Sequence, residues 1–160
     1  MTKFANTMAL TMFALLLFAP GAKAQQSIET VSIETQISYK DMVKSLSAAV
    51  KEEGMFVVTR ASASSGAKNR GIQIKGNMVV GVYRNDFAIR MLESSIAAGI
   101  EAPIRFYITE RRDGSARLSY QKPSVVFAPY MANAEPELAD VAKELDVIFA
   151  AIAARATKEE

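Results

Sequence analysis

The sequence predicts a single α+β domain in which helices cover a mostly antiparallel sheet. Apolar residues alternate with period two in some segments and follow a helical period in others. Asp113-Gly114 stands between two alternating segments, a strong hairpin signal that excludes an all-parallel sheet. The predicted order is β-α-β-(short α)-β-α-β-β-α.

The first residues read as an export signal rather than as part of this domain. Lys3 precedes a short apolar run at 8–19, which Pro20 and Gly21 end before Ala22-Lys23-Ala24. The run is too short to cross a bilayer comfortably, and small residues two apart are typical of a cleavage site. We expect residues 1–24 to be a signal peptide cleaved after Ala24, and residues 25–160 to form one periplasmic or secreted domain. An uncleaved membrane anchor is the alternative.

The predicted domain begins with a strand and a helix that are adjacent in the sequence. Alternation at Val31, Ile33 and Ile37 predicts a strand over about 28–37. Ser38, with Asp41 three residues later, is typical of a helix start, and Gly54 is a typical end. One apolar helix face is predicted at Met42, Val43, Leu46, Ala49 and Val50.

Two more strands, at 55–62 and 77–84, enclose the polar stretch "ASASSGAKNRGIQI" at 61–74. We expect one helical turn at 67–70 within it, ended by Gly71 with a backbone shape that favours glycine. A helix at 86–98 follows, and Gly99 ends it. That helix is apolar on two sides, so both sides are expected to be covered.

The remaining elements complete the predicted sheet and its cover. The segments 103–110 and 116–121 are expected to form the hairpin strands, the first with one wet face. An ordered, Pro-marked connector leads to Pro136, a residue suited to a helix's first turn. The last helix, about 136–156, carries a long apolar stripe that includes Leu145, which we expect to be buried.

Composition excludes several classes of function. The chain contains no cysteine and no histidine, which excludes thiol catalysis, His-dependent triads and typical zinc or haem sites. We therefore expect no cofactor and no bound metal. The chain has 19 basic and 17 acidic residues, and two of the basic residues, Lys3 and Lys23, lie in the signal. A neutral mature domain argues against nucleic-acid binding.

Four fragments spread over about 39–130 together resemble the bacterial family called domain of unknown function 302. They are "EEGMFVVTR" at 52–60, an Ala-Lys-x-x-Gly element, a Gly-Ile-acidic run into a strand, and a final Ser-Tyr-x-x-Pro. The matching residues of the last three are Ala67, Lys68, Gly71, Ile72 and Ile74; Gly99, Ile100, Glu101, Pro103, Ile104 and Arg105; and Leu118, Ser119, Tyr120 and Pro123.

The resemblance implies a TATA-binding-protein-like α+β fold and brings no assigned reaction. Many family members carry an Asp-His pair where this chain has Ser62 and Ala63. Many also carry a Gly-Asn-Pro turn where this chain has the residues 83–85. Whatever chemistry a family histidine performs is therefore absent from this chain.

Lys68, Arg70 and Arg84 are the candidate anion-binding residues. They belong to a basic stretch at 60–90, and a helical turn there would offer free N–H groups to a carboxylate or phosphate. The alternatives are a solvated face, or a neutralising contact with the acidic last 26 residues, which hold seven acidic and three basic side chains.

Tyr83, Tyr107 and Tyr120 are the candidate pocket aromatics, with Phe127 and Tyr130 beside them, under the last helix. The alternative is that they close the core and its rim. Glu101 is either a general base or half of a local ion pair with Arg105.

Together these features predict an exported, non-enzymatic domain that binds a small anionic ligand or a protein partner, with a homodimer as one expected assembly. We expect no membrane span once the signal is cleaved. A carboxylate-dependent hydrolase or other enzyme, and a structural envelope-associated protein, are the alternatives.

Overall fold

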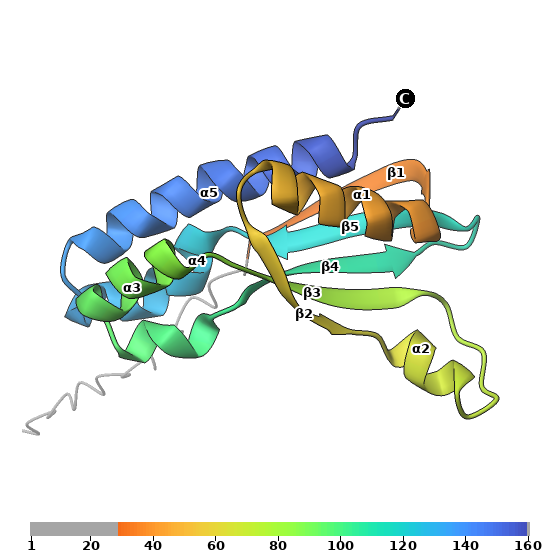
Figure 1. The fold of residues 1–160 in the computed structure, drawn as a ribbon, viewed down its shortest axis with the longest axis horizontal. Coiled ribbons are helices and arrows are strands. Elements are labelled where there is room, and N and C mark those ends of the chain that lie inside the picture. The colour runs from red at the N-terminus through yellow and green to blue at the C-terminus, as the bar shows by residue number, and fades with distance from the viewer. Residues whose placement is uncertain (1–28, 160) are drawn as a thin grey trace, which may run out of the picture.

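Five strands form one antiparallel sheet in the order β1-β5-β4-β3-β2. The computed structural model describes residues 29–159 (Figure 1), so the predicted signal at 1–24 lies outside the described residues. The strands are β1 (Thr30–Ser38), β2 (Phe56–Ala61), β3 (Asn77–Tyr83), β4 (Ile104–Glu110) and β5 (Ser115–Gln121). The helices are α1 (Tyr39–Glu52), α2 (Ala63–Lys68), α3 (Asn85–Ser94), α4 (Pro123–Phe127) and α5 (Glu137–Ala156), with 3-10 segments η1 (Ala97–Glu101) and η2 (Ala128–Asn133).

The predicted α+β class and element order are confirmed, with two added pieces in the connector. Within residues 29–159, no helix combines the length and the apolar character that crossing a bilayer requires.

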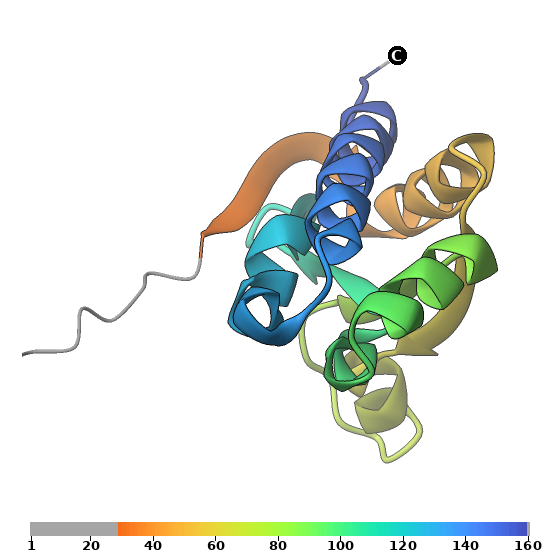
Figure 2. The same ribbon diagram turned by 90° about the vertical axis from the view of Figure 1, so that its left-hand side faces the viewer.

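Helices α1 and α5 lie over one face of the sheet, as Figures 1 and 2 show from two sides. Three aromatic rings mark the centre of this layer. Phe106 of β4 stacks on Phe149 of α5 at 4.8 Å between ring centroids, and Tyr120 of β5 lies 5.1 Å from Phe106. Leu145 is buried against this core, as the apolar stripe predicts. The core thus fixes α5 over the central strands.

The start of α1 has the capping arrangement that the sequence predicts. The Ser38 hydroxyl accepts a hydrogen bond from the Asp41 backbone N–H at 3.1 Å and donates to the Asp41 carboxylate at 2.8 Å. Satisfying a free N–H in the first turn stabilises a helix by about 0.5–2 kcal/mol. Gly71 has φ +74, as predicted for a glycine-favouring turn.

Gly81 of β3 occupies a point of close approach on the other face of the sheet. A Cβ at Gly81 would lie 2.7 Å from Cγ of Pro103 and would also overlap the Thr59 hydroxyl. A larger residue would therefore push β2 and the segment before β4 away from β3.

Two predicted boundaries were wrong, and the connector contains two helical pieces that were not predicted. The short helix covers 63–68 rather than 67–70, because the Ser62 hydroxyl accepts the Ser65 N–H and starts it earlier. The helix predicted over 86–98 ends at Ser94, whose hydroxyl accepts the Leu138 N–H at 3.1 Å and so joins it to the start of α5. The connector contains α4 and η2, and Pro123 occupies the first turn of α4.

Candidate functional site

A surface hollow opens where β4 and β5 diverge. The two strands pair from Phe106–Tyr120 to Glu110–Ala116, and the pairing does not include Arg105. The end of β5 instead continues along β1, where Gln121 pairs with Thr30. The hollow, here called the strand-end hollow, has a volume of about 250 Å³. Its lining residues are Thr30, Glu101, Ile104, Arg105, Tyr107, Ser119, Tyr120, Gln121 and Val126.

Glu101 is held in the strand-end hollow by a tyrosine from a separate segment. It is the last residue of η1, and the Tyr130 hydroxyl in η2 donates a hydrogen bond to its Oε1 at 2.7 Å. This hydrogen bond is the main cause that raises the pKa of Tyr130, so the phenol stays protonated and continues to donate. The carboxylate of Glu101 therefore has a fixed position, with its second oxygen free of that bond.

Arg105 supplies a positive charge beside that carboxylate. Its Nη2 lies 3.9 Å from Glu101 Oε2, too far for a hydrogen bond, and its side chain is 59% exposed against 27% for Glu101. Arg105 makes no side-chain hydrogen bond to any residue in the described range. An exposed pair of this kind contributes only about 0–1 kcal/mol, so a ligand separates it at little cost.

Two tyrosines complete the strand-end hollow. Tyr107 is 43% exposed, whereas Tyr120 is only 7% exposed and burial raises the pKa of its phenol. The Tyr120 hydroxyl has no hydrogen-bond partner within residues 29–159. Every fully buried side-chain oxygen in that range does have a partner, so the Tyr120 hydroxyl is not fully buried. This hydroxyl therefore reaches solvent. The exposed ring of Tyr107 thus stands beside a pair of opposite charges, whereas the ring of Tyr120 packs against Phe106 and Phe149 on the helix-covered face of the sheet.

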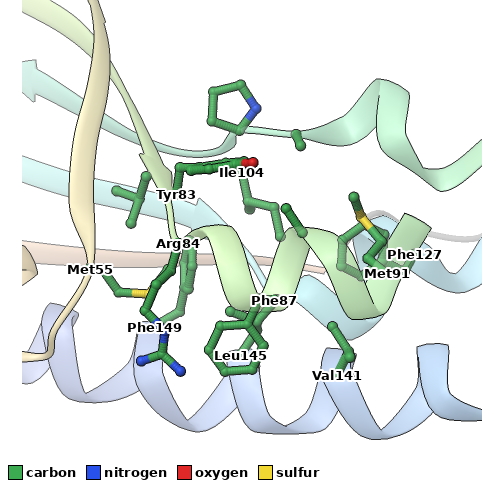
Figure 3. A pocket seen from close by; sticks show the side chains of 14 residues that line it. Met55, Tyr83, Arg84, Phe87, Met91, Ile104, Phe127, Val141, Leu145 and Phe149 are labelled. Atoms are coloured by element: carbon green, nitrogen blue, oxygen red, sulfur yellow. The ribbon is translucent and has the colours of Figure 1, made fainter. Parts of the chain in front are cut away.

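Tyr83 and Arg84 line a different space, an apolar cavity between α3 and α5 (Figure 3). Met55, Phe87, Met91, Phe127, Leu145 and Phe149 are among its other walls. This cavity lies under the last helix, where the sequence predicts a pocket, but its volume is only about 30 Å³. A cavity that binds benzene measures about 150 Å³, and sites for small molecules about 300–1,000 Å³. The strand-end hollow, at about 250 Å³, has room for a small ligand that the apolar cavity lacks, so it is the better candidate of the two.

Arg84 is already engaged at the mouth of the apolar cavity. Its Nε and Nη2 donate to both carboxylate oxygens of Asp86 at 2.7 and 3.0 Å, and its guanidinium lies 4.2 Å from the centre of the Phe87 ring. An anion at Arg84 would have to displace this paired carboxylate.

The three predicted anion-binding residues do not come together. Lys68 and Arg70 lie at the end of α2, before β3, whereas Arg84 follows β3, so a strand of roughly 20 Å separates them (Figure 1). Two N–H groups at the start of α2 are already bonded within the protein. The Ala63 N–H donates to Asn77 Oδ1 at 2.9 Å, and the Ser65 N–H donates to the Ser62 hydroxyl. Anion binding at Lys68 and Arg70 stays a prediction. Such a site would consist of these two exposed side chains and would not include Arg84.

The alternative for the basic stretch, a contact with the acidic end of the chain, is present at Arg90. Its guanidinium donates to Glu137 at 2.6 Å and to both oxygens of Glu144 at 2.7 and 3.0 Å. This arginine joins α3 to α5 and so has a structural role.

Sequence reasoning named Tyr107 and Tyr120 within one aromatic group and Glu101 with Arg105 as a separate pair, and it did not join the two groups. It placed Glu101 beside Arg105, and Tyr107 on a wet strand face, but it missed Thr30 and Gln121. Both lie on strands that pair only in three dimensions. Two of the four family-like fragments, at 99–105 and 118–123, supply residues to this one hollow.

Comparisons with known proteins agree with this fold. The sequence profile of the family described as "Domain of unknown function DUF302" matches residues 31–155, which extends beyond the 39–130 region of the resemblance at both ends. The crystal structure of an uncharacterized conserved protein DUF302 from Bacillus stearothermophilus is similar, with a TM-score of 0.69 at 18% identity, covering 81% of this chain and 99% of that chain. A search of curated proteins gave no match.

Proposed function

The chain belongs to the DUF302 family, and from this premise we propose that it is an exported, non-enzymatic domain that binds a small polar ligand in the strand-end hollow. One observation carries the proposal: Glu101, Arg105 and Tyr107 border a single space of about 250 Å³, with Ser119 and Gln121 on the neighbouring strand. A few converging polar groups beside aromatic rings are typical of small-molecule sites.

The chemistry of the strand-end hollow supports binding rather than catalysis. Its serine, Ser119, shares a hydrogen bond of 3.0 Å with the Ser32 hydroxyl, so no base activates it. Glu101 accepts a hydrogen bond from a phenol, and the chain has no histidine to act as a second acid or base. The export signal predicted at 1–24 supports a location outside the cytoplasm.

A thermal-shift experiment tests this proposal with four probes that share one phenyl ring: 2-phenylethylamine, 3-phenylpropanoate, 2-phenylethanol and L-phenylalanine. A probe at 100 times its dissociation constant stabilises the protein by about 2.7 kcal/mol. We expect at least one probe to raise the unfolding midpoint, and Tyr107→Ala to abolish the effect. The control is Phe56→Ala, which truncates an exposed aromatic residue on β2.

Two results would count against the proposal. If no probe shifts the midpoint, or if Tyr107→Ala responds like Phe56→Ala, the strand-end hollow is not the binding site. Turnover in a hydrolase panel that disappears on Glu101→Gln would instead favour a carboxylate-dependent enzyme.

A further inference from the structure

The strand-end hollow presents one negative and one positive side chain to the same space. Resting on the function proposed above, we propose that its ligand is a zwitterion of the α-amino-acid class, with the ammonium group bound to Glu101 and the carboxylate bound to Arg105. This inference specifies the ligand's chemistry and concerns only residues of the hollow.

The separation of the two charges is the first argument. At 3.9 Å between Arg105 Nη2 and Glu101 Oε2, the groups are close enough to attract each other but share no hydrogen bond. The shortest ion pairs of Arg84, Arg90 and Arg111, by contrast, close to between 2.6 and 3.0 Å. The pair in the strand-end hollow is thus left with unused donors and an unused acceptor.

The fixed carboxylate is the second argument. The Tyr130 hydroxyl occupies Oε1 of Glu101 at 2.7 Å, and this leaves Oε2 as the oxygen nearer to Arg105. An ammonium group that donates to Oε2 would stand next to the Arg105 guanidinium. A carboxylate on the same ligand would then cancel the repulsion between the two cations and receive the forked donors of arginine. A simple amine or a simple acid meets only one of these needs.

The neighbouring rings and neutral polar groups are the third argument. Tyr107 offers an exposed aromatic face from β4, suited to an apolar or aromatic side chain of the ligand. Ser119 and Gln121 add neutral polar groups on the next strand. An α-amino acid carries both charges on one carbon, so its side chain remains free to lie on Tyr107.

Isothermal titration calorimetry on the purified protein tests the inference with three matched probes. L-phenylalanine carries both charges, 2-phenylethylamine only the ammonium, and 3-phenylpropanoate only the carboxylate. We expect L-phenylalanine to bind at least about tenfold more tightly than either half, the usual effect of one charge-assisted hydrogen bond.

Two variants should show a crossed pattern. Glu101→Gln should weaken L-phenylalanine and strengthen 3-phenylpropanoate, because it removes a repelling carboxylate. Arg105→Gln should weaken L-phenylalanine and strengthen 2-phenylethylamine. The matched controls are Glu93→Gln and Arg112→Gln, both exposed and outside the hollow, which should leave all three affinities unchanged.

The results distinguish failure of the zwitterionic ligand class from failure of the proposed binding site. Equal affinity for all three probes, or no crossing between the variants, would overturn the zwitterion and leave the strand-end hollow as a binding site. Failure of every probe to bind there would overturn the proposed function and the inference with it.

Discussion

Leu145→Ala should destabilise the domain by about 3–4 kcal/mol. Leu145 is only 5% exposed in α5, where it lies against the cavity that Phe149 also lines. The substitution removes three buried carbon atoms, worth about 2.4 kcal/mol in transfer free energy at about 0.8 kcal/mol each. The space left behind adds a further cost, since the existing cavity of about 30 Å³ shows that the neighbours do not close completely.

Urea denaturation of the wild type and the variant at pH 7 measures this change as a difference in the free energy of unfolding. Val147→Ala is the matched control, because Val147 lies in the same helix but is 71% exposed. That control should change stability by no more than about 0.5 kcal/mol. A loss below about 1 kcal/mol for Leu145→Ala would refute the reasoning, because it would mean that α5 is not docked on the core.

The remaining predictions concern close packing, pH and export. Gly81→Ala should destabilise the domain by about 1–3 kcal/mol in the same assay. Gly66→Ala is the control: it lies in α2, a Cβ there would have no atom within 4 Å, and the substitution should be neutral or stabilising. A larger loss of stability for Gly66→Ala than for Gly81→Ala would contradict the packing of β3. The hydrogen bonds from Arg90 lower the pKa of Glu144 below its usual value of 4.5, so this pair's stabilisation is present above pH 4.5 and is lost as the pH falls through the lowered pKa. Glu144→Gln should therefore flatten the acid limb of stability against pH, and an unchanged limb would show that the pair does not form. Intact mass of the exported protein should show cleavage after Ala24, and a mass that retains residues 1–24 would contradict the assignment.

The parts of the fold that local chemistry dictates were predictable from the sequence. Ser38 and Asp41 marked the start of α1 because capping involves only neighbouring residues. Asp113-Gly114 marked the hairpin for the same reason, and Gly114 has the positive φ of such a turn. Alternation in 103–110 separated the buried face of β4 from the wet one.

Boundaries set by distant contacts were not predictable. Helix α3 ends at Ser94 because Ser94 bonds to the start of α5, 44 residues later in the chain. The strand-end hollow depends in the same way on β1 pairing with β5, and on Tyr130 reaching Glu101 from another segment. The sequence therefore predicted Tyr107 as a pocket aromatic and Glu101 as a partner of Arg105 independently, and only the tertiary structure brings these groups to one hollow.

The most direct test of the account is an amide NMR titration of the uniformly ¹⁵N-labelled protein with L-phenylalanine. Saturable shift changes should cluster at 101–107 and 119–121, the two segments that border the strand-end hollow. The amides at 63–71, around α2, should stay unchanged. Flat spectra, or changes centred on α2 beside Lys68 and Arg70, would contradict the strand-end hollow as the binding site.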